Sequence, residues 1–585
     1  MVPSALGTVI AGPVNVQNKK AAFTIVAAGI LCLVSTCNAA REPKNDANSL
    51  RSNANSLRNN VEAGTRPQFV HDDKSWDTTR QLYTLRQFEP AWSNADGISA
   101  SADSALKVLE DASAEGLNPQ DFGVDELRAM RESFKTAKTP PNETPGPSQD
   151  EFELRLSYSL MRYVSQLCFG RINPADVLPE WPKPQKACEV AQIVQDALAS
   201  NSVEKLAEQL SPKLQEYAAL KTALSRYREI AAQGGWQSLS TPTTKKPSAA
   251  FDSMLQARLA ITADPDLKAF QTRHGLKPDG RIGPKTIDAL NVPVDQRIAQ
   301  IEINLDRMRW IADRFEPQHI RVNIPGFELT VHDADQVPLQ MRAIVGSQEN
   351  ATPILDGVME YLVFSPYWNI PLSIATKELL PKIQGNRKYL ERENIEVVRG
   401  SGAKAEVIDP SKINWHKESE LSVYQLRQKP GTMNALGLVK FIFPNSYNIY
   451  LHDTPSGNLF DRLTRTLSHG CIRVEHPKEL ATYLLRDQPE WTPEAIDEAM
   501  HAGMEKRANL KTRIPVHLFY WTAWVDTDGN AQFREDVYGY DEKHWELTKG
   551  ALPAPNATNI DVDKVGTGIV PDTAGLHGQS GLSKQ

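Results

Sequence analysis

The first half of the chain repeats apolar residues at the spacing of α-helices. Residues 103–117, 151–167 and 197–210 place apolar side chains three or four positions apart. Gly116 stands near the end of the first stretch, where a helix C-cap is expected. The pattern predicts a helical scaffold domain over residues 71–255.

After residue 318 the apolar positions alternate with polar ones. Alternation over short runs bounded by Pro, Gly and Asn is typical of antiparallel strands. The expected strands lie within residues 319–333, 360–368, 437–445, 447–453 and 515–526. We therefore expect an α+β multidomain protein, with a β-rich domain over residues 296–550.

Residues 373–430 interrupt the strand pattern. This stretch is charged, reads as part helix and part loop, and is too long for a plain connection. We interpret it as an inserted subdomain that forms a lid, with Trp415 and Tyr424 resting over a cleft. The alternative is a surface decoration without such a role.

A small helical hairpin is predicted between these two regions, within residues 256–295. Gly275 suits the end of its first helix, and Pro284 has the favoured first position of its second. A plain reading is a hairpin that only packs. We place a domain boundary in the polar segment 237–249.

The two ends of the chain have different compositions from the middle. Residues 1–40 contain two lysines, an apolar run and small residues, which is typical of a secretory signal. The alternatives are an uncleaved amino-terminal membrane anchor and a lipid-anchored Cys37. Residues 41–70 read as a solvated linker, and residues 551–585 as a disordered tail. All three readings of residues 1–40 put the rest of the chain outside the cytoplasm.

Charge and cysteine content narrow the function classes. Lys and Arg number 65 against 72 Asp and Glu, so a dedicated nucleic-acid binder is not expected. In an oxidising compartment Cys168 and Cys188 could form a disulfide, or they could be two separate buried thiols. Either way Cys471 is left as an unpaired and reactive candidate.

The residues around Cys471 suit acyl transfer. A thiol becomes a strong nucleophile when a nearby imidazole accepts its proton, and His452 and His469 are both close in the sequence. Gly470 allows a substrate carbonyl to approach, and amide N–H groups around Gly470 and Cys471 could stabilise an oxyanion. The residues themselves do not decide which histidine is the base.

Two other readings of this segment are open. His452, His469 and Cys471 could bind zinc, with Asp453 as a further ligand. Cys471 could instead be a buried structural thiol. On the acyl-transfer reading no metal or other cofactor is expected.

The motifs resemble a known family. His452, followed after fifteen residues by Ser-His-Gly-Cys-Ile-Arg at 468–473, resembles the signature of the L,D-transpeptidase catalytic domain, the YkuD-type fold. Leu267, Phe270, Gly275, Asp279 and neighbouring residues of the hairpin resemble a peptidoglycan-binding repeat. Together with a helical scaffold and an inserted lid, these features resemble the large branch of that family.

The resemblance implies roles for individual residues. Cys471 would be the nucleophile and His452 its base, with the backbone carbonyl of Asp453 orienting the ring. His469 would position substrate or shape the oxyanion hole. The further supporting or substrate-lining residues would be Ser468, Gly470, Arg473, Tyr450 and Trp368.

The resemblance also implies a reaction and a location. The enzyme would release D-Ala from a peptidoglycan tetrapeptide stem through a thioester and form a 3→3 cross-link in the periplasm. With water as acceptor it would be a carboxypeptidase or endopeptidase, and with a protein amine it would tether that protein to the wall. A wall-binding structural protein is the alternative without catalysis.

Overall fold

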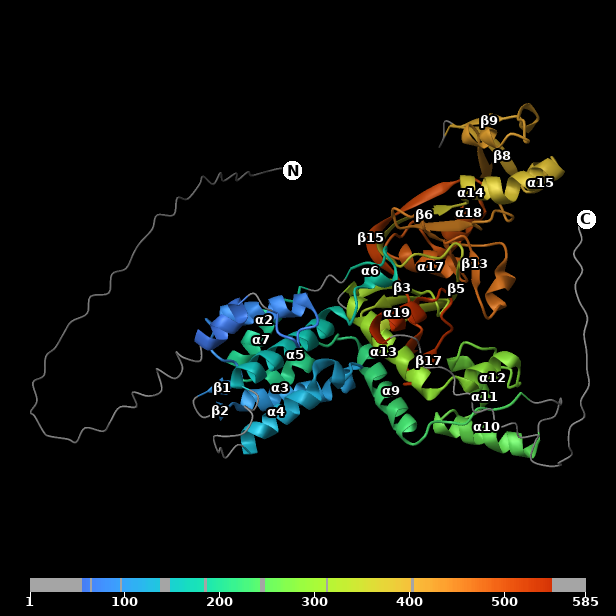
Figure 1. Cartoon of the computed structure of the whole chain (residues 1–585). Coiled ribbons are helices and arrows are strands. Elements are labelled where there is room, and N and C mark those ends of the chain that lie inside the picture. Colours follow the sequence, from blue (N-terminus) through green and yellow to red (C-terminus); the bar gives the residue numbers. More distant parts are fainter. Residues whose placement is uncertain are drawn as a thin grey trace, which may run out of the picture. The chain divides into compact units, whose positions relative to one another are not determined.

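The computed structural model describes most of the chain between residues 55 and 549 (Figure 1). All described residues belong to the second of the chain's two structural units, Leu50–Gln585. The predicted signal at 1–40 and tail at 551–585 lie outside the described residues. The structure describes residues 55–63, 66–94, 97–136, 148–183, 187–241, 248–311, 314–400 and 405–549.

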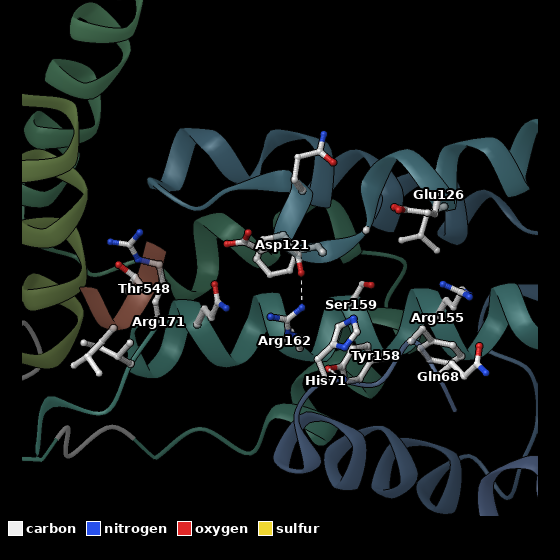
Figure 2. A pocket seen from close by; sticks show the side chains of 18 residues that line it. Gln68, His71, Asp121, Glu126, Arg155, Tyr158, Ser159, Arg162, Arg171 and Thr548 are labelled. Atoms are coloured by element: carbon white, nitrogen blue, oxygen red, sulfur yellow. Dashed lines mark hydrogen bonds between the residues drawn. The ribbon is translucent and has the colours of Figure 1, made fainter. Parts of the chain in front are cut away.

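Helices dominate the first part, as the apolar spacing predicts. The helix α5 (Gln149–Phe169) is central to it, because its buried residues join one apolar core with those of its neighbours. Figure 2 shows one face of α5 beside a cavity. The neighbours are α2 (Asp73–Leu85), α3 (Ala100–Glu110), α4 (Val124–Thr136), α7 (Val190–Ala199) and α8 (Leu206–Leu210), with 3₁₀ turns η1 (Asp111–Glu115), η2 (Pro119–Phe122) and η3 (Val203–Lys205) and a hairpin of β1 (Ser93–Asn94) and β2 (Gly97–Ile98). The short helix α6 (Pro174–Val177) packs in a different cluster, with Trp181 and Trp310.

Local turns shorten two of the predicted helices. The stretch 103–117 changes from α3 to the 3₁₀ turn η1, and Gly116 ends η1 with a positive φ of 72°. The predicted helix at 197–210 is wrong as one element: α7 ends at Ala199, and Asn201, at φ 49°, turns the chain before η3 and α8. The helical spacing continues across that turn because both halves face the same core.

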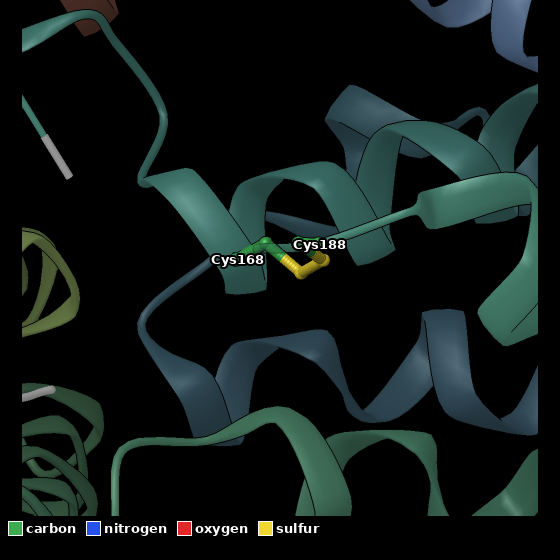
Figure 3. The surroundings of a disulfide bond; sticks show 2 residues. All are labelled: Cys168 and Cys188. Carbon is green, nitrogen blue, oxygen red and sulfur yellow. A yellow bond between two sulfur atoms is a disulfide. The ribbon is translucent and has the colours of Figure 1, made fainter. Parts of the chain in front are cut away.

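A disulfide joins Cys168, in the last turn of α5, to Cys188 just before α7 (Figure 3). It closes a loop between residues 20 positions apart. Of the two alternatives left open by the sequence, the structure has the bonded one.

The linker interpretation of residues 41–70 is wrong for its described helical part. Residues 55–62 form a helix, and Leu57 and Val61 are buried in one cluster with Trp76 and Tyr83. Two apolar residues spaced four apart are enough to attach this otherwise polar helix to α2.

The predicted hairpin forms, but its unit begins earlier. α11 (Leu267–Arg273) and α12 (Pro284–Asn291) share a core with α10 (Ala249–Ile261). Leu255 and Leu259 of α10 pack with Phe270 of the hairpin. The predicted domain boundary between residues 255 and 256 is therefore wrong, since it would divide α10. Two longer helices, α9 (Gln215–Ala232) and α13 (Val294–Ile311), pack together and against a hairpin of β16 (Ala523–Val525) and β17 (Ala531–Phe533).

The β-rich domain contains a nine-stranded sheet in the order β13-β5-β14-β12-β11-β6-β15-β3-β4, and a further β4–β5 pairing closes it on itself. The prediction of antiparallel strands is wrong for three pairs, since β3–β15, β12–β14 and β5–β13 are parallel. The strands are β3 (Gln318–Asn323), β4 (Glu328–Asp333), β5 (Gln336–Gly346), β6 (Leu355–Phe364), β11 (Val439–Ile442), β12 (Leu451–His452), β13 (Thr466–Ser468), β14 (Ile472–Val474) and β15 (Lys506–Phe519).

Two helices, α17 (Pro477–Leu484) and α18 (Pro493–His501), contribute Leu480, Leu484 and Ile496 to the same core as the sheet. A last helix, α19 (Tyr540–Lys549), contacts α13. Among the helices that the structure describes, none combines the length and apolar character needed to cross a membrane.

The insertion has its own sheet and its own core. The order of its sheet is β7-β10-β8-β9. Its strands were not predicted, because they are short and lie among charged residues. Trp415 is 2% exposed inside this core, so its predicted place over the cleft is wrong. The elements are β7 (Trp368–Asn369), α14 (Leu372–Ile374), the π-helical η5 (Ala375–Leu379), α15 (Leu380–Gly385), α16 (Tyr389–Arg392), β8 (Ile395–Arg399), β9 (Glu406–Ile408), the 3₁₀ turns η7 (Pro410–Lys412) and η8 (Glu418–Ser422), and β10 (Gln425–Gln428).

Candidate active site

Cys471 lies in the short turn between β13 and β14. β14 pairs with β12 in parallel, so that Leu451 is opposite Ile472 and His452 is opposite Arg473. The Ile472 N–H also donates to the Tyr450 carbonyl at 3.1 Å. This register brings the segment containing Tyr450 and His452 beside the cysteine, although about twenty residues separate them in the chain.

Hydrogen bonds hold the turn in place. Ser468 Oγ donates to the Cys471 carbonyl at 2.6 Å and accepts from the Gly470 N–H at 3.1 Å. Gly470 has φ 109°, and a Cβ there would lie 3.1 Å from Ile449 Cδ1, so glycine suits this position. Ser468 therefore fixes the backbone that presents the thiol.

A second hydroxyl, in the loop between β5 and β6, supports the turn. Thr352 Oγ1 donates to the Gly470 carbonyl at 2.8 Å and accepts from the Gly346 N–H at 2.8 Å. The sequence reasoning gave Thr352 no role. Its full burial becomes visible only in the fold.

The Cys471 thiol is partly buried and protonated at rest. Its Sγ lies 3.8 Å from the Asn448 carbonyl oxygen. The side chain of Tyr450 makes a hydrogen bond with the thiol. Burial raises the pKa of Cys471 to about 11, against smaller opposing effects of Tyr450 and Arg473. Burial also raises the pKa of Tyr450, so its phenol stays protonated.

His452 is buried and has a defined orientation. Its Nδ1 lies 2.5 Å from the Asp453 carbonyl, which confirms the predicted contact. A carbonyl only accepts, so Nδ1 carries the proton and Nε2 is left as the acceptor. Burial, with the nearby charge of Arg473, lowers the pKa of His452 to about 3. The ring is therefore neutral at pH 7 and able to accept a proton.

Asp453 and Arg473 flank this pair in different ways. The carboxylate of Asp453 accepts from the N–H groups of Leu438 and Thr454, at 2.8 and 2.6 Å, and burial raises its pKa. Arg473 Nε is buried with no hydrogen-bond partner among the described residues, and burial lowers the pKa of this guanidinium. Asp453 therefore fixes the backbone of Leu438 and Thr454 by hydrogen bonds, whereas Arg473 supplies positive charge near His452.

His469 is oriented toward the insertion. It is about half exposed, and its Nε2 lies 2.5 Å from Glu378 Oε1 in the π-helical segment η5. Glu378 was missed by the sequence reasoning, because 91 positions separate it from His469. Short π-helical segments are frequent at functional sites, but this feature becomes visible only in the fold and not in the sequence.

Trp368 is positioned by the insertion. It pairs with Gln428 in the small sheet and packs on the insertion's core. These contacts do not bring Trp368 to Cys471.

Within the described part of the chain, no group of three or more His, Cys, Asp or Glu side chains is arranged to hold a metal ion.

Comparison with known proteins agrees with this geometry. Residues 317–512 match the model of the "L,D-transpeptidase catalytic domain", YkuD. The chain contains an L,D-transpeptidase domain. Residues 266–290 match "Putative peptidoglycan binding domain" and residues 77–224 match "Scaffold domain". The predicted fold class, with a helical scaffold, a small peptidoglycan-binding unit and a β-rich YkuD domain, is confirmed.

One curated relative matches part of this chain. A "Putative L,D-transpeptidase" of Haemophilus influenzae is 35% identical over 259 residues, which cover 43% of this chain and 51% of that protein. The match thus spans about half the length of the relative. "Epoxide hydrolase 1" of Sus scrofa is 24% identical over 99 residues, covering 17% of this chain and 22% of that protein.

A solved structure entitled "Structure of the Ldtfm-avibactam carbamoyl enzyme" also matches. It is 13% identical, covers 35% of this chain and 49% of the other, and has a TM-score of 0.14. Matches of this extent, and that of the epoxide hydrolase, carry no argument about the activity of the chain.

Proposed function

We propose that the protein is an exported L,D-transpeptidase that uses Cys471 to form 3→3 cross-links between peptidoglycan stem peptides. The observation that carries the proposal is the pairing of the strand that ends at His452, a neutral histidine, with the strand that begins directly after Cys471. Both lie in the part of the chain that matches the L,D-transpeptidase catalytic domain. The peptidoglycan-binding domain supports a substrate in the cell wall. We assign the location to the periplasm.

In the first step His452 Nε2 accepts the thiol proton as Cys471 Sγ attacks the carbonyl of the third stem residue. The bond to the terminal D-Ala then breaks, and His452 returns its proton to the leaving amine. A thioester between Cys471 and the tripeptide remains. In the second step the side-chain amine of another stem attacks the thioester, its proton passes to His452, and the thiol is restored.

The oxyanion that forms in each step needs an N–H donor. The Gly470 N–H already donates to Ser468 Oγ, so it is a poorer candidate than the sequence suggested. We assign the role to the Cys471 N–H, with Arg473 supplying positive charge nearby.

The test is incubation with a purified disaccharide-tetrapeptide, followed by mass spectrometry. The proposal expects a cross-linked dimer, released D-Ala and an acyl-enzyme whose added mass is on Cys471. Cys471→Ala should abolish all three products. Tripeptide without dimer would assign water as the acceptor, and turnover by Cys471→Ala would overturn the cysteine mechanism.

A further inference from the structure

A cavity of about 680 Å³ follows one face of α5 and is lined mostly by the scaffold, with Leu547 and Thr548 of α19 also in its lining and Cys471 not among the lining residues. Its volume lies in the usual range for small-molecule sites, about 300–1,000 Å³. The α5 residues that line it are spaced three or four positions apart and therefore share one helix face: Arg155, Tyr158, Ser159, Arg162 and Gln166. We call this cavity the α5 groove.

Three arginines follow the groove, as Figure 2 shows for Arg171, Arg162 and Arg155. Arg155 and Arg162 are two helical turns apart, which is about 10 Å along the axis. Arg162 donates to the Asp121 carbonyl, and Arg155 donates to Glu151 on its own helix. Arg155 is ion-paired with Glu151 at 2.9 Å, and Arg162 lies 3.5 Å from Asp72, so a ligand carboxylate would share these guanidinium groups with the two acids.

Arg171, at one end of the row, has unused donors. Its side chain is 5% exposed, and its Nε donates to Asp306 at 2.5 Å. Nη1 and Nη2 have no hydrogen-bond partner among the described residues, although Nη1 lies 3.7 Å from Glu302 Oε2. Gln166 Oε1 is likewise buried without a hydrogen-bond partner in the described part. Buried polar atoms without partners are costly, which points to a ligand that completes them.

The rest of the lining restricts the ligand. Asp121 and Glu126 also line the groove, so a uniform polyanion would be repelled, whereas an amine would be attracted. Guanidinium groups already lie over the aromatic rings of the lining, which disfavours stacking of sugars. The pairs are Arg155 over Phe69 at 4.7 Å, and Arg162 near Tyr158 and Phe122 at 5.7 and 5.9 Å.

We propose that the α5 groove binds a short peptide with several carboxylates and a free amine, which is the chemistry of an uncross-linked stem peptide. Arg155, Arg162 and Arg171 hold its carboxylates, while Asp121 and Glu126 attract its amine. The ligand class rests on the proposed function. A stem held there would keep the wall polymer close to the enzyme between turnovers.

The test uses the full chain as Cys471→Ala, which prevents turnover, and a photoreactive stem tetrapeptide as probe. After illumination, labelled peptides are mapped by mass spectrometry. We expect label within residues 66–172 in addition to label near residue 471. The double variant Arg155→Gln/Arg162→Gln should lower groove labelling at least tenfold and leave labelling near residue 471 unchanged.

The matched control is Arg128→Gln, because Arg128 is an ion-paired arginine on α4 that does not line the groove. Arg128→Gln should give the same groove labelling as the parent. Arg155→Gln alone leaves the contact of Arg162 with Asp121 intact and should lower groove labelling only in part. A probe with amidated carboxylates should lose the groove label. The inference would be overturned if groove labelling were absent or were equal in all variants. It would also be overturned if a photoreactive polyglutamate peptide labelled the groove and the stem peptide did not.

Acylation of Cys471 by the tetrapeptide is measured separately in the unmodified chain. Acylation without groove labelling would overturn the inference and leave the proposed function standing. Groove labelling without acylation would support the peptide site and count against the proposed function.

Discussion

The resting chemistry of the site is set by burial of two side chains. Burial raises the pKa of Cys471 to about 11 and lowers that of His452 to about 3. Both groups are therefore neutral at pH 7, and the site holds a thiol and an imidazole. A charged pair at the same place would be partly desolvated, so the proton is expected to move only as substrate is attacked.

Alkylation of Cys471 by iodoacetamide tests this resting state. With a pKa of about 11, the thiolate fraction at pH 7 is about 10⁻⁴, and the rate should rise about tenfold per pH unit toward pH 11. The measurement is the mass-resolved alkylation rate between pH 6 and 11. His452→Ala should leave this profile nearly unchanged. A plateau below pH 8 that disappears in His452→Ala would mean a preformed ion pair instead.

The two histidines should differ once substrate is present. His452→Ala should lower the rate of acylation by the tetrapeptide about 10²–10⁴-fold, because the base is lost. His469→Ala is the matched control and should mainly raise KM, since this ring is half exposed and contacts Glu378. Single-turnover acylation rates compare the two. If His469→Ala has the larger effect on the rate, the roles are reversed.

At the scale of elements, the insertion meets the site through Glu378 and His469. The lid role remains a prediction, and this contact is where it can be tested. Glu378→Ala should leave acylation of Cys471 intact but shift its fate from dimer toward hydrolysed tripeptide, because the cover that excludes water is no longer held. The dimer-to-tripeptide ratio is measured by mass spectrometry. Glu391→Ala, an exposed acid of α16, is the control; equal ratios in both variants would contradict the lid.

Local signals predicted some elements and missed others. The long apolar repeat of α5 was sufficient, because this helix faces a core along most of its length. The strand expected over residues 447–453 is wrong for most of its length, since only Leu451–His452 form a strand there. The strands of the insertion were missed since they have only two to five residues each. Parallel pairing, as between β12 and β14, depends on the whole chain path, and so does the meeting of Glu378 with His469.

The disulfide should stabilise the scaffold mainly by restricting its unfolded chain. For a closed loop of this length the contribution is about 3 kcal/mol. Cys168→Ala/Cys188→Ala should therefore lower the free energy of unfolding of the scaffold by about that amount, measured by urea denaturation followed by the circular dichroism of helices, against the parent chain. Acylation of Cys471 in the folded variant should stay normal. An unchanged unfolding midpoint would contradict the prediction.

At the scale of the whole molecule, one buried acid links segments from three parts of the chain. Asp306 of α13 accepts from Arg171 after α5 at 2.5 Å, from Arg309 at 2.5 Å and from His544 of α19 at 3.1 Å. The charge of Arg171, with the His544 hydrogen bond, outweighs burial and holds the pKa of Asp306 well below its usual range. This carboxylate thus connects the helical scaffold to the helix that enters the L,D-transpeptidase domain.

Asp306→Asn should therefore destabilise the chain strongly, because it leaves buried guanidinium groups without a countercharge. Breaking a buried ion pair in this way costs about 3–5 kcal/mol. The folded-state pKa is depressed, so the stability from Asp306 is present above its unfolded pKa near 3.9 and is lost as pH falls below it. The midpoints of thermal unfolding of Asp306→Asn and parent should differ most at neutral pH, and the difference should begin to narrow as pH falls below about 4. Asp528→Asn, at an exposed turn acid, is the control. A difference between Asp306→Asn and parent that does not narrow in acid would show that Asp306 acts through packing and not through its charge.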